Sequence, residues 1–186
     1  HRKALFLSLG ITLFLAIVPL LTKRNDLINL MILIFLYICL AQSWNILAGY
    51  AGQVSLGHAA FFGLGAITTR VLWVWGTPFF LAFLTGGVVA VVFALIIGHP
   101  ALRLKGIYFA IGTLGLGQIL KITIGNVLPT VADLPGDYIA TYNLIPRYYL
   151  FLILAVITVA VVYWVSHSKL GLGMVAVRED EEAAKA

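Results

Sequence analysis

The sequence predicts an all-α integral membrane protein with about six transmembrane helices and a polar C-terminal helical segment. Hydrophobic residues make up 62% of the 186 residues and charged residues only 10%, and the mean hydropathy is +1.05. A soluble domain carries about 25% charged residues. A surface this poor in charge must therefore face lipid. The apolar residues also fall into runs of roughly 20, the length of helix that crosses a hydrocarbon layer of about 30 Å.

Six runs are expected to span the membrane and, with their links, to form a transmembrane domain over residues 1–166. A seventh segment, residues 48–58, is a candidate re-entrant or broken helix, because it is rich in glycine. A cytoplasmic segment follows over residues 167–186. His99 and Pro100 are expected in a short basic loop, and Asn126–Pro146 in a longer one. The expected spans are residues 4–21, 27–47, 59–75, 79–98, 106–125 and 148–166.

The distribution of basic residues predicts that both ends of this sequence lie in the cytoplasm. Cytoplasmic loops of membrane proteins carry an excess of Lys and Arg. With the first residues inside, the inner segments hold Arg2, Lys3, Arg103, Lys105, Lys169, Arg178 and Lys185, and the outer segments hold Lys23, Arg24 and Arg147. Seven residues against three favour this orientation, and hence an even number of spans.

Several kinds of chemistry are not expected. The sequence has no GxxxxGK[ST] phosphate loop, so nucleotide hydrolysis is not expected here. Four scattered histidines and one cysteine, Cys39, show no metal-ligand spacing, so neither a metal nor another cofactor is expected. No nucleophile–base pair is evident, so no catalytic residue is assigned and the chain is not expected to be an enzyme. A net charge of +5 without a basic face does not favour nucleic-acid binding.

The stretch Ala41–Ala66 is apolar, dense in glycine and free of Lys, Arg, Asp and Glu. Glycines in a membrane helix allow neighbouring helices to approach closely. Polar side chains at membrane depth mark either a solute path or helix–helix contacts. Ser55 and His58 are three residues apart and are expected to share a helix face. The packing candidates are Gly49, Gly52, Gly57, Gly63 and Gly65, and the path candidates are Gln53, Ser55 and His58.

The fifth apolar run holds a second group of path candidates. Thr113, Gly117 and Lys121 follow a spacing of four residues, and Gln118 is adjacent to Gly117. The alternative for Lys121 is that its side chain only extends outward to the lipid headgroups from a position near the end of the span. Thr113, Gly117 and Gln118 are therefore taken as candidates for contact with a solute.

The C-terminal segment, KLGLGMVAVREDEEAAKA (Lys169–Ala186), is expected to end in a short helix. Asp180 suits the position before a helix, Glu181 and Glu182 suit its first turn, and Ala183 and Ala184 extend it. Gly171 and Gly173 are expected in the link between the last span and this helix. The segment either contacts a soluble partner or is an ordinary solvated helix beside the membrane.

Three segments together resemble permeases of branched-chain amino acid ABC importers of the LivM type. Glu182-Ala183-Ala184 matches the EAA motif by which importer permeases dock on their ATPase subunit. The other two segments resemble that family in the same order: WNILAGYAGQVSLGHAAFFGLGA (Trp44–Ala66) and LRLKGIYFAIGTLGLGQILK (Leu102–Lys121). By this resemblance Arg178, Glu181, Glu182, Ala183 and Ala184 are the candidates for coupling to the ATPase.

The resemblance implies a permease subunit that imports leucine, isoleucine and valine across the bacterial plasma (inner) membrane. It implies a second permease subunit, two cytoplasmic ATP-binding subunits and a periplasmic or extracellular solute-binding protein as partners, all around the lipid bilayer. Relatives in the superfamily carry urea, short amides or aromatic acids, so these remain alternative solutes, and a structural membrane protein is a further alternative. The family's glycine and spans after the EAA motif are missing, so the sequence is expected to be truncated after that motif.

Overall fold

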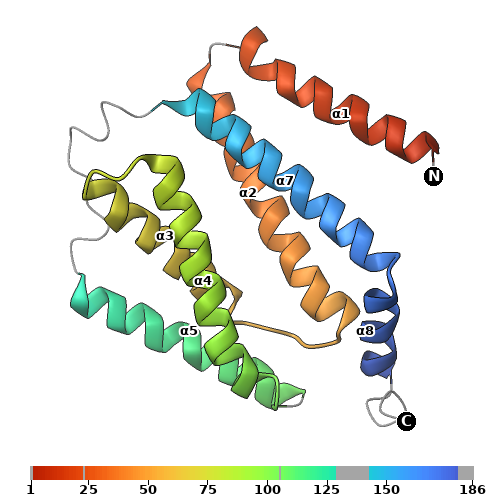
Figure 1. Cartoon of the computed structure of the whole chain (residues 1–186), viewed down its shortest axis with the longest axis vertical. Helices are drawn as coiled ribbons and strands as arrows, with labels where there is room; N and C mark the ends of the chain where they lie inside the picture. The colour runs from red at the N-terminus through yellow and green to blue at the C-terminus, as the bar shows by residue number, and fades with distance from the viewer. Residues whose placement is uncertain (1, 23, 105, 129–142, 180–186) are drawn as a thin grey trace. The chain divides into compact units, whose positions relative to one another are not determined.

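The computed structural model describes residues 2–22, 24–104, 106–128 and 143–179, and the described part of the chain is helical and contains no strand. The chain divides into two compact units. The first comprises the described residues of His1–Ile46 and Tyr142–Ala186, and the second those of Leu47–Thr141. Figure 1 shows the helices of each unit, coloured by position in the sequence.

In the first unit, helices α2 (Asn25–Asn45) and α7 (Leu144–Ser166) pack side by side and run in the same direction. Phe35 of α2 meets Tyr148 of α7 edge to face, with ring centroids 5.4 Å apart. The buried core of the unit consists of Ile28, Phe35, Cys39, Tyr148, Leu152 and Ala155.

Helix α1 (Arg2–Leu21) is held on α7 by two tyrosine hydroxyls. Pro19 lies inside α1 and has no N–H to donate to the carbonyl of Leu15, four residues earlier. The hydroxyl of Tyr148 donates to that carbonyl over 2.7 Å, and the hydroxyl of Tyr149 donates to the carbonyl of Ala16 over 3.1 Å. Neighbouring helices are known to re-satisfy backbone groups that proline frees in a membrane. Tyr148, which is fully buried, does so here.

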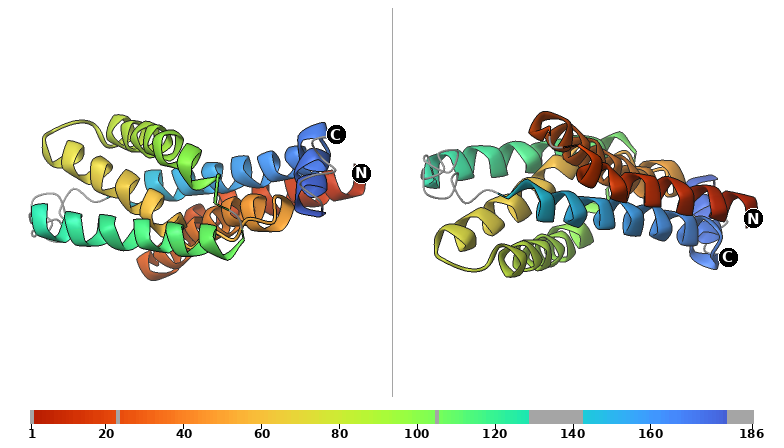
Figure 2. Two further views of the ribbon diagram at one scale, coloured as in Figure 1. Left: turned by 90° about the horizontal axis from the view of Figure 1, so that it is seen from below. Right: turned by 90° about the horizontal axis from the view of Figure 1, so that it is seen from above.

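Helix α8 (Lys169–Glu179) follows α7 after a tight turn and points away from the α7 axis, as both views in Figure 2 show. The hydroxyl of Ser168 donates to the Val165 carbonyl and accepts from the amide of Gly171. A Cβ at Gly171 would collide with the Val165 carbonyl oxygen. Gly171 and Gly173 were expected in a link before a helix that begins near Asp180, but both lie in α8. Gly171 is instead the residue that lets the turn close.

In the second unit, α3 (His58–Val74) and α4 (Phe79–Ala101) form an antiparallel pair. Gly76 joins them with a φ of 91°, a conformation that glycine adopts without strain. The amide of Thr77 donates to the Leu72 carbonyl over 3.0 Å and closes the end of α3. Helix α5 (Ile107–Val127) packs mainly on α3 and less extensively on α4.

Two further boundaries differ from the expected loops. His99 and Pro100 lie in the last turn of α4, and the chain turns only at Leu102–Leu104. Helix α7 begins at Leu144, because the side chain of Asn143 caps it by accepting from the amide of Ile145 over 3.2 Å. Pro146 is tolerated in the first helical turn, where its missing N–H would have no partner.

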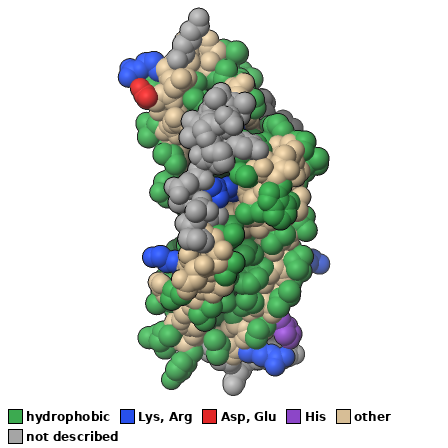
Figure 3. Space-filling view, turned by 90° about the vertical axis from the view of Figure 1, so that its left-hand side faces the viewer, with side chains coloured by type: hydrophobic (Ala, Val, Ile, Leu, Met, Phe, Trp, Pro, Cys, Tyr) green, Lys and Arg blue, Asp and Glu red, His purple; other side chains and the backbone are tan. Residues whose placement is uncertain are grey.

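The surface of the described chain is apolar. Figure 3 shows a face on which hydrophobic side chains predominate and charged ones are few. Within the described residues, four helices are long and apolar enough to cross a membrane: Asn25–Tyr50, Phe79–Ala101, Ile107–Val127 and Leu144–Ser166. Gly10–Leu21 and His58–Val74 are shorter apolar helices. The count of six spans and the assignment of residues 1–166 to one transmembrane domain stay predictions.

Candidate functional site

The glycine-rich stretch contains a break in helical structure. The π-helix η1 (Ile46–Tyr50) continues α2, and residues 51–57 that follow it are not helical. Gly52 has a φ of 70°, which ends the helix, and the amide of Gln53 donates to the Leu47 carbonyl over 3.0 Å. Ser55 therefore lies outside any helix, whereas His58 begins α3. The expectation that these two residues share a helix face is wrong.

The non-helical segment is held against α5 by Thr113. The amide of Leu56 donates to the Thr113 hydroxyl over 3.1 Å, and that hydroxyl donates to the Ala110 carbonyl over 3.0 Å. A Cβ at Gly57 would lie 2.6 Å from the Thr113 carbonyl oxygen, so only glycine fits this approach. Ser55 and Thr113 are 3% and 4% exposed. The structure thus brings two path candidates, Ser55 and Thr113, into one buried region between the segment and α5.

Two polar atoms beside this region have no hydrogen-bond partner in the part of the chain that the structure describes. They are Oε1 of Gln53 and Nδ1 of His58, and both atoms are buried, although each side chain is partly exposed. A buried polar group without a partner costs roughly 1–3 kcal/mol. These two atoms are therefore places where water or a polar solute would be stabilised.

The other two path candidates lie further along α5. Gly117 is half-buried, and a Cβ there would touch Ala60 of α3 at 4.0 Å. Gln118 is exposed, on a different side of the helix from Thr113. The spacing of four residues drifts around a helix with 3.6 residues per turn. For that reason Thr113 is buried, Gly117 half-buried and Lys121 exposed.

The packing candidates differ in what surrounds them. Gly65 approaches the backbone of α4, where a Cβ would lie 3.2 Å from the Gly86 carbonyl oxygen, but a Cβ at Gly63 would meet nothing within 4 Å. Gly49 lies in η1 and Gly52 at the positive φ that ends it. The packing roles of Gly49 and Gly63 stay predictions.

The closest approach of α3 and α4 was missed by the sequence analysis. A Cβ at Gly86 would collide with the Gly65 carbonyl oxygen and with the Thr69 hydroxyl, which itself donates to Gly65 over 2.8 Å. The adjacent Gly87 has open space at its Cβ position. A Gly-Gly pair inside an apolar run was the signal available, but it does not tell which glycine faces the partner helix.

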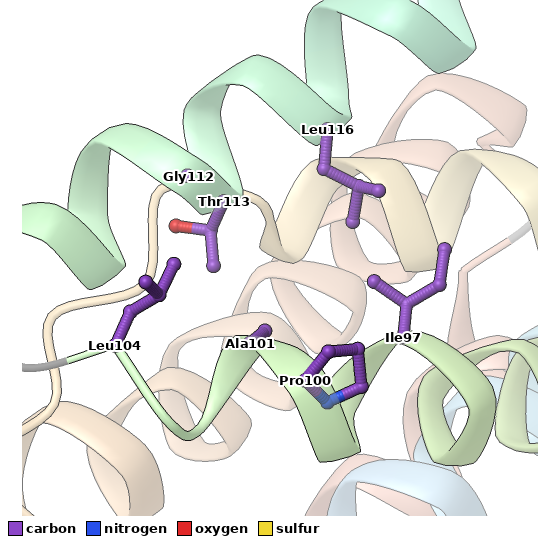
Figure 4. A pocket seen from close by; sticks show the side chains of 7 residues that line it. All are labelled: Ile97, Pro100, Ala101, Leu104, Gly112, Thr113 and Leu116. Atoms are coloured by element: carbon purple, nitrogen blue, oxygen red, sulfur yellow. The ribbon is translucent and has the colours of Figure 1, made fainter.

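A shallow cleft of about 220 Å³ lies beside Thr113, between the end of α4 and α5. Figure 4 shows apolar side chains from both helices around it, with the Thr113 hydroxyl as the polar group. The cleft is lined by Ile97, Pro100, Ala101, Leu104, Gly112, Thr113 and Leu116. Its walls offer no group for catalysis, and the described residues contain no cluster of His, Cys, Asp or Glu that could hold a metal.

The candidates for ATPase coupling are only partly visible. Arg178 lies in the last turn of α8 and takes part in an interaction within the chain. Glu181, Glu182, Ala183 and Ala184 lie outside the described residues, as do residues 129–142 of the expected loop Asn126–Pro146.

Comparison with known proteins identifies the family to which the chain belongs. Residues 27–186 match the family model described as the permease component of the branched-chain amino acid transport system, and the chain belongs to this family of multi-pass membrane permeases. No solved structure matches the chain.

Two curated relatives bear the same name, the high-affinity branched-chain amino acid transport system permease protein LivM. The protein of Escherichia coli strain K12 is 33% identical over 109 residues, and that of Salmonella typhimurium strain LT2 is 32% identical over 109 residues. Each match covers 58% of this chain and 25% of the relative, so the chain matches about a quarter of their length.

Proposed function

We propose that this chain is a transmembrane permease subunit of an ABC importer that takes up branched-chain amino acids. The observation that carries the proposal is the match of residues 27–186 to the branched-chain amino acid permease family. Separate ATPase subunits drive the transport, a second permease subunit completes the path, and a periplasmic or extracellular binding protein delivers the solute. The complex lies in the bacterial plasma membrane.

The direction of two packed helices supports a six-span topology. Helices α2 and α7 run in parallel, and both are long enough to cross the membrane. Two parallel spans must be separated by an odd number of crossings. Helices α4 and α5 supply two of these. The third crossing therefore falls to α3, whose 17 residues extend about 25 Å. Helices shorter than the hydrocarbon layer are accommodated by local thinning of the bilayer.

The solute path, in this proposal, runs along the non-helical segment and α5. Irregular backbone is tolerated at membrane depth only where protein buries it or where it lines a water-filled cavity. The unpartnered atoms of Gln53 and His58 favour the second condition. The residues proposed to line the path are Gln53, Ser55, His58, Thr113 and Gly117 where the segment meets α5, and Gln118 on the exposed side of α5.

Coupling to the ATPase is assigned to the segment that follows α7. Helix α8 turns away from α7 and leads directly to Glu181, Glu182, Ala183 and Ala184, with Arg178 in its last turn. Replacing Glu182 by Lys in the full-length protein is expected to leave ATP hydrolysis running while amino acid uptake falls. Unchanged uptake would remove Glu182 from the coupling role.

Transport by the reconstituted importer tests the proposal as a whole. The full-length permease is reconstituted in liposomes together with the second permease, the ATPases and the binding protein. ATP-dependent uptake of labelled leucine is then measured. The expected result is that excess valine inhibits leucine uptake and that excess urea does not. A complex with inactive ATPase subunits is the control, and competition by urea in place of valine would contradict the assigned solute.

A further inference from the structure

Helices α4 and α5 present outer faces of different chemistry. The exposed residues along the middle of α4 are aliphatic, among them Val88, Val91 and Leu95. The polar side chain within residues 79–98 is Thr85, whose hydroxyl is bonded to the Leu81 carbonyl of its own helix. Such a face is suited to lipid. The outer face of α5 carries Gln118 and Lys121, and both side chains are exposed.

Gln118 and Lys121 lie on one stripe of α5 together with Leu114 and Gly125, since positions three, four and seven apart share a helix face. The stripe is separate from the buried positions Phe109 and Thr113. A Cβ at Gly125 would meet nothing within 4 Å, so the stripe has free space beside Lys121. Among the described residues, no carboxylate forms an ion pair with Lys121.

The depth of these residues makes their exposure to lipid unfavourable. Helix α5 is 21 residues long, and a residue rises about 1.5 Å. Gln118 therefore lies about 14 Å from the end of the helix at Val127, near its middle, and Lys121 about 9 Å from it. An amide near the middle of a span cannot reach the headgroups. Polar and ionisable groups at this depth normally face a path or a protein neighbour.

We propose that Gln118 and Lys121 together hold the carboxylate of the amino acid as it passes along α5. The Gln118 amide donates neutral hydrogen bonds, and the Lys121 ammonium adds a charge-assisted one, which is the stronger kind. A zwitterionic solute supplies the negative group that this stripe lacks. The inference rests on the proposed function, because it requires that amino acids pass along this chain.

Leucine transport by the complete importer in liposomes tests the site through substitutions of both residues. Lys121→Gln is expected to lower uptake efficiency about ten-fold or more, because a hydrogen bond to a charged group is lost. Lys121→Arg keeps the positive charge and most of the transport. Gln118→Glu, which has nearly the same shape, reduces uptake because it places a second carboxylate beside that of the solute. Recovery of all subunits on purification stays at the wild-type level.

The double variant Lys121→Gln/Gly125→Lys is the matched control. It returns a lysine to the same stripe one turn nearer the headgroups, where it can anchor the helix but not serve the original site. If this variant restores uptake, Lys121 is only an interfacial anchor and the proposal is wrong. Loss of the second permease on purification of Lys121→Gln would make the stripe a subunit contact and also overturn it.

Wild-type uptake separates the two proposals. If the wild-type complex takes up leucine and the Lys121→Gln variant does so equally well, the carboxylate site is wrong and the proposed function stands. Absence of ATP-dependent uptake of any amino acid by the wild-type complex overturns the proposed function and the site with it.

Discussion

The hydroxyl of Tyr148 in α7 replaces the hydrogen-bond donor that α1 lacks at Pro19. This hydroxyl donates a hydrogen bond to the Leu15 carbonyl, which has no N–H donor within α1. The ring of Tyr148 packs on Phe35 of α2. One side chain thus joins three helices of the first unit. The contact bridges 133 positions in sequence, and no local pattern links a proline in the first run to a tyrosine in the last.

Tyr148→Phe is expected to destabilise the first unit by about 1–3 kcal/mol, because the Leu15 carbonyl is left buried without a donor. Thermal unfolding of the purified protein in detergent measures the loss. Pro19→Ala provides an internal control, since it returns an N–H to α1 and lets the helix satisfy that carbonyl itself. The cost of Tyr148→Phe should then shrink in the Pro19→Ala background. Equal costs in both backgrounds would show that the hydroxyl does not compensate for the proline.

Gly57 has a steric role that a matched glycine lacks. Gly57→Ala places a Cβ against the Thr113 carbonyl oxygen and is expected to cost about 1–3 kcal/mol of stability, as overpacking does. Gly63→Ala, six positions further along the chain and open at its Cβ position, should change stability by about 1 kcal/mol or less, toward greater stability because alanine favours helix. Thermal unfolding of both variants makes the comparison. Equal losses would refute the close contact between the segment and α5.

At the scale of whole elements, the pairing of α3 with α4 depends on one face of α4. Gly86→Ala is expected to push the two helices apart and to destabilise the second unit by about 1–3 kcal/mol. Gly87→Ala, the neighbouring position on an open face, should be neutral or slightly stabilising. The rate at which a protease cuts the α3–α4 turn in detergent measures the difference between the two variants. If Gly87→Ala proves the more damaging change, α4 is rotated relative to the arrangement described here.

The position of most helices could be predicted from the sequence, because the bilayer sets a minimum length for an apolar run. The points at which the helices break were predicted less accurately. The break near Gly52 was anticipated as a region, yet the placing of Ser55 outside the helix depends on the contacts of Leu56 and Gly57 with α5, a tertiary effect. Helix α8 was missed because Gly171 and Gly173 suggest a link, whereas tight packing against Val165 favours glycine within the helix.

For the whole molecule, orientation is open to a direct chemical test. In a Cys39→Ala background, Thr77→Cys should react with a membrane-impermeant maleimide on intact cells, because the proposed topology puts the α3–α4 turn on the outer side. Arg103→Cys and Lys169→Cys should react only after the membrane is opened. If α3 does not cross, the pattern inverts at all three positions: Thr77→Cys is protected and the other two are labelled from outside.

The candidate site could be predicted in part at this scale. Thr113 and the segment before α3 were singled out separately from their composition, and the hydrogen bond from Leu56 to Thr113 joins them. Their proximity depends on how α3 and α5 pack, which no spacing within either run specifies. Gly86 was missed for the same reason.

The first unit is interrupted in sequence, and this has a consequence for how the protein is made. Residues 47–141 separate the half that contains α2 from the half that contains α7. At the usual rates of synthesis, this gap lasts on the order of 5–20 s. During that time the face of α2 that carries Phe35 and Cys39 lacks its partner α7, while α3 and α4 of the second unit can already pair. The second unit, whose sequence is inserted within that of the first, is therefore expected to assemble before the first is complete.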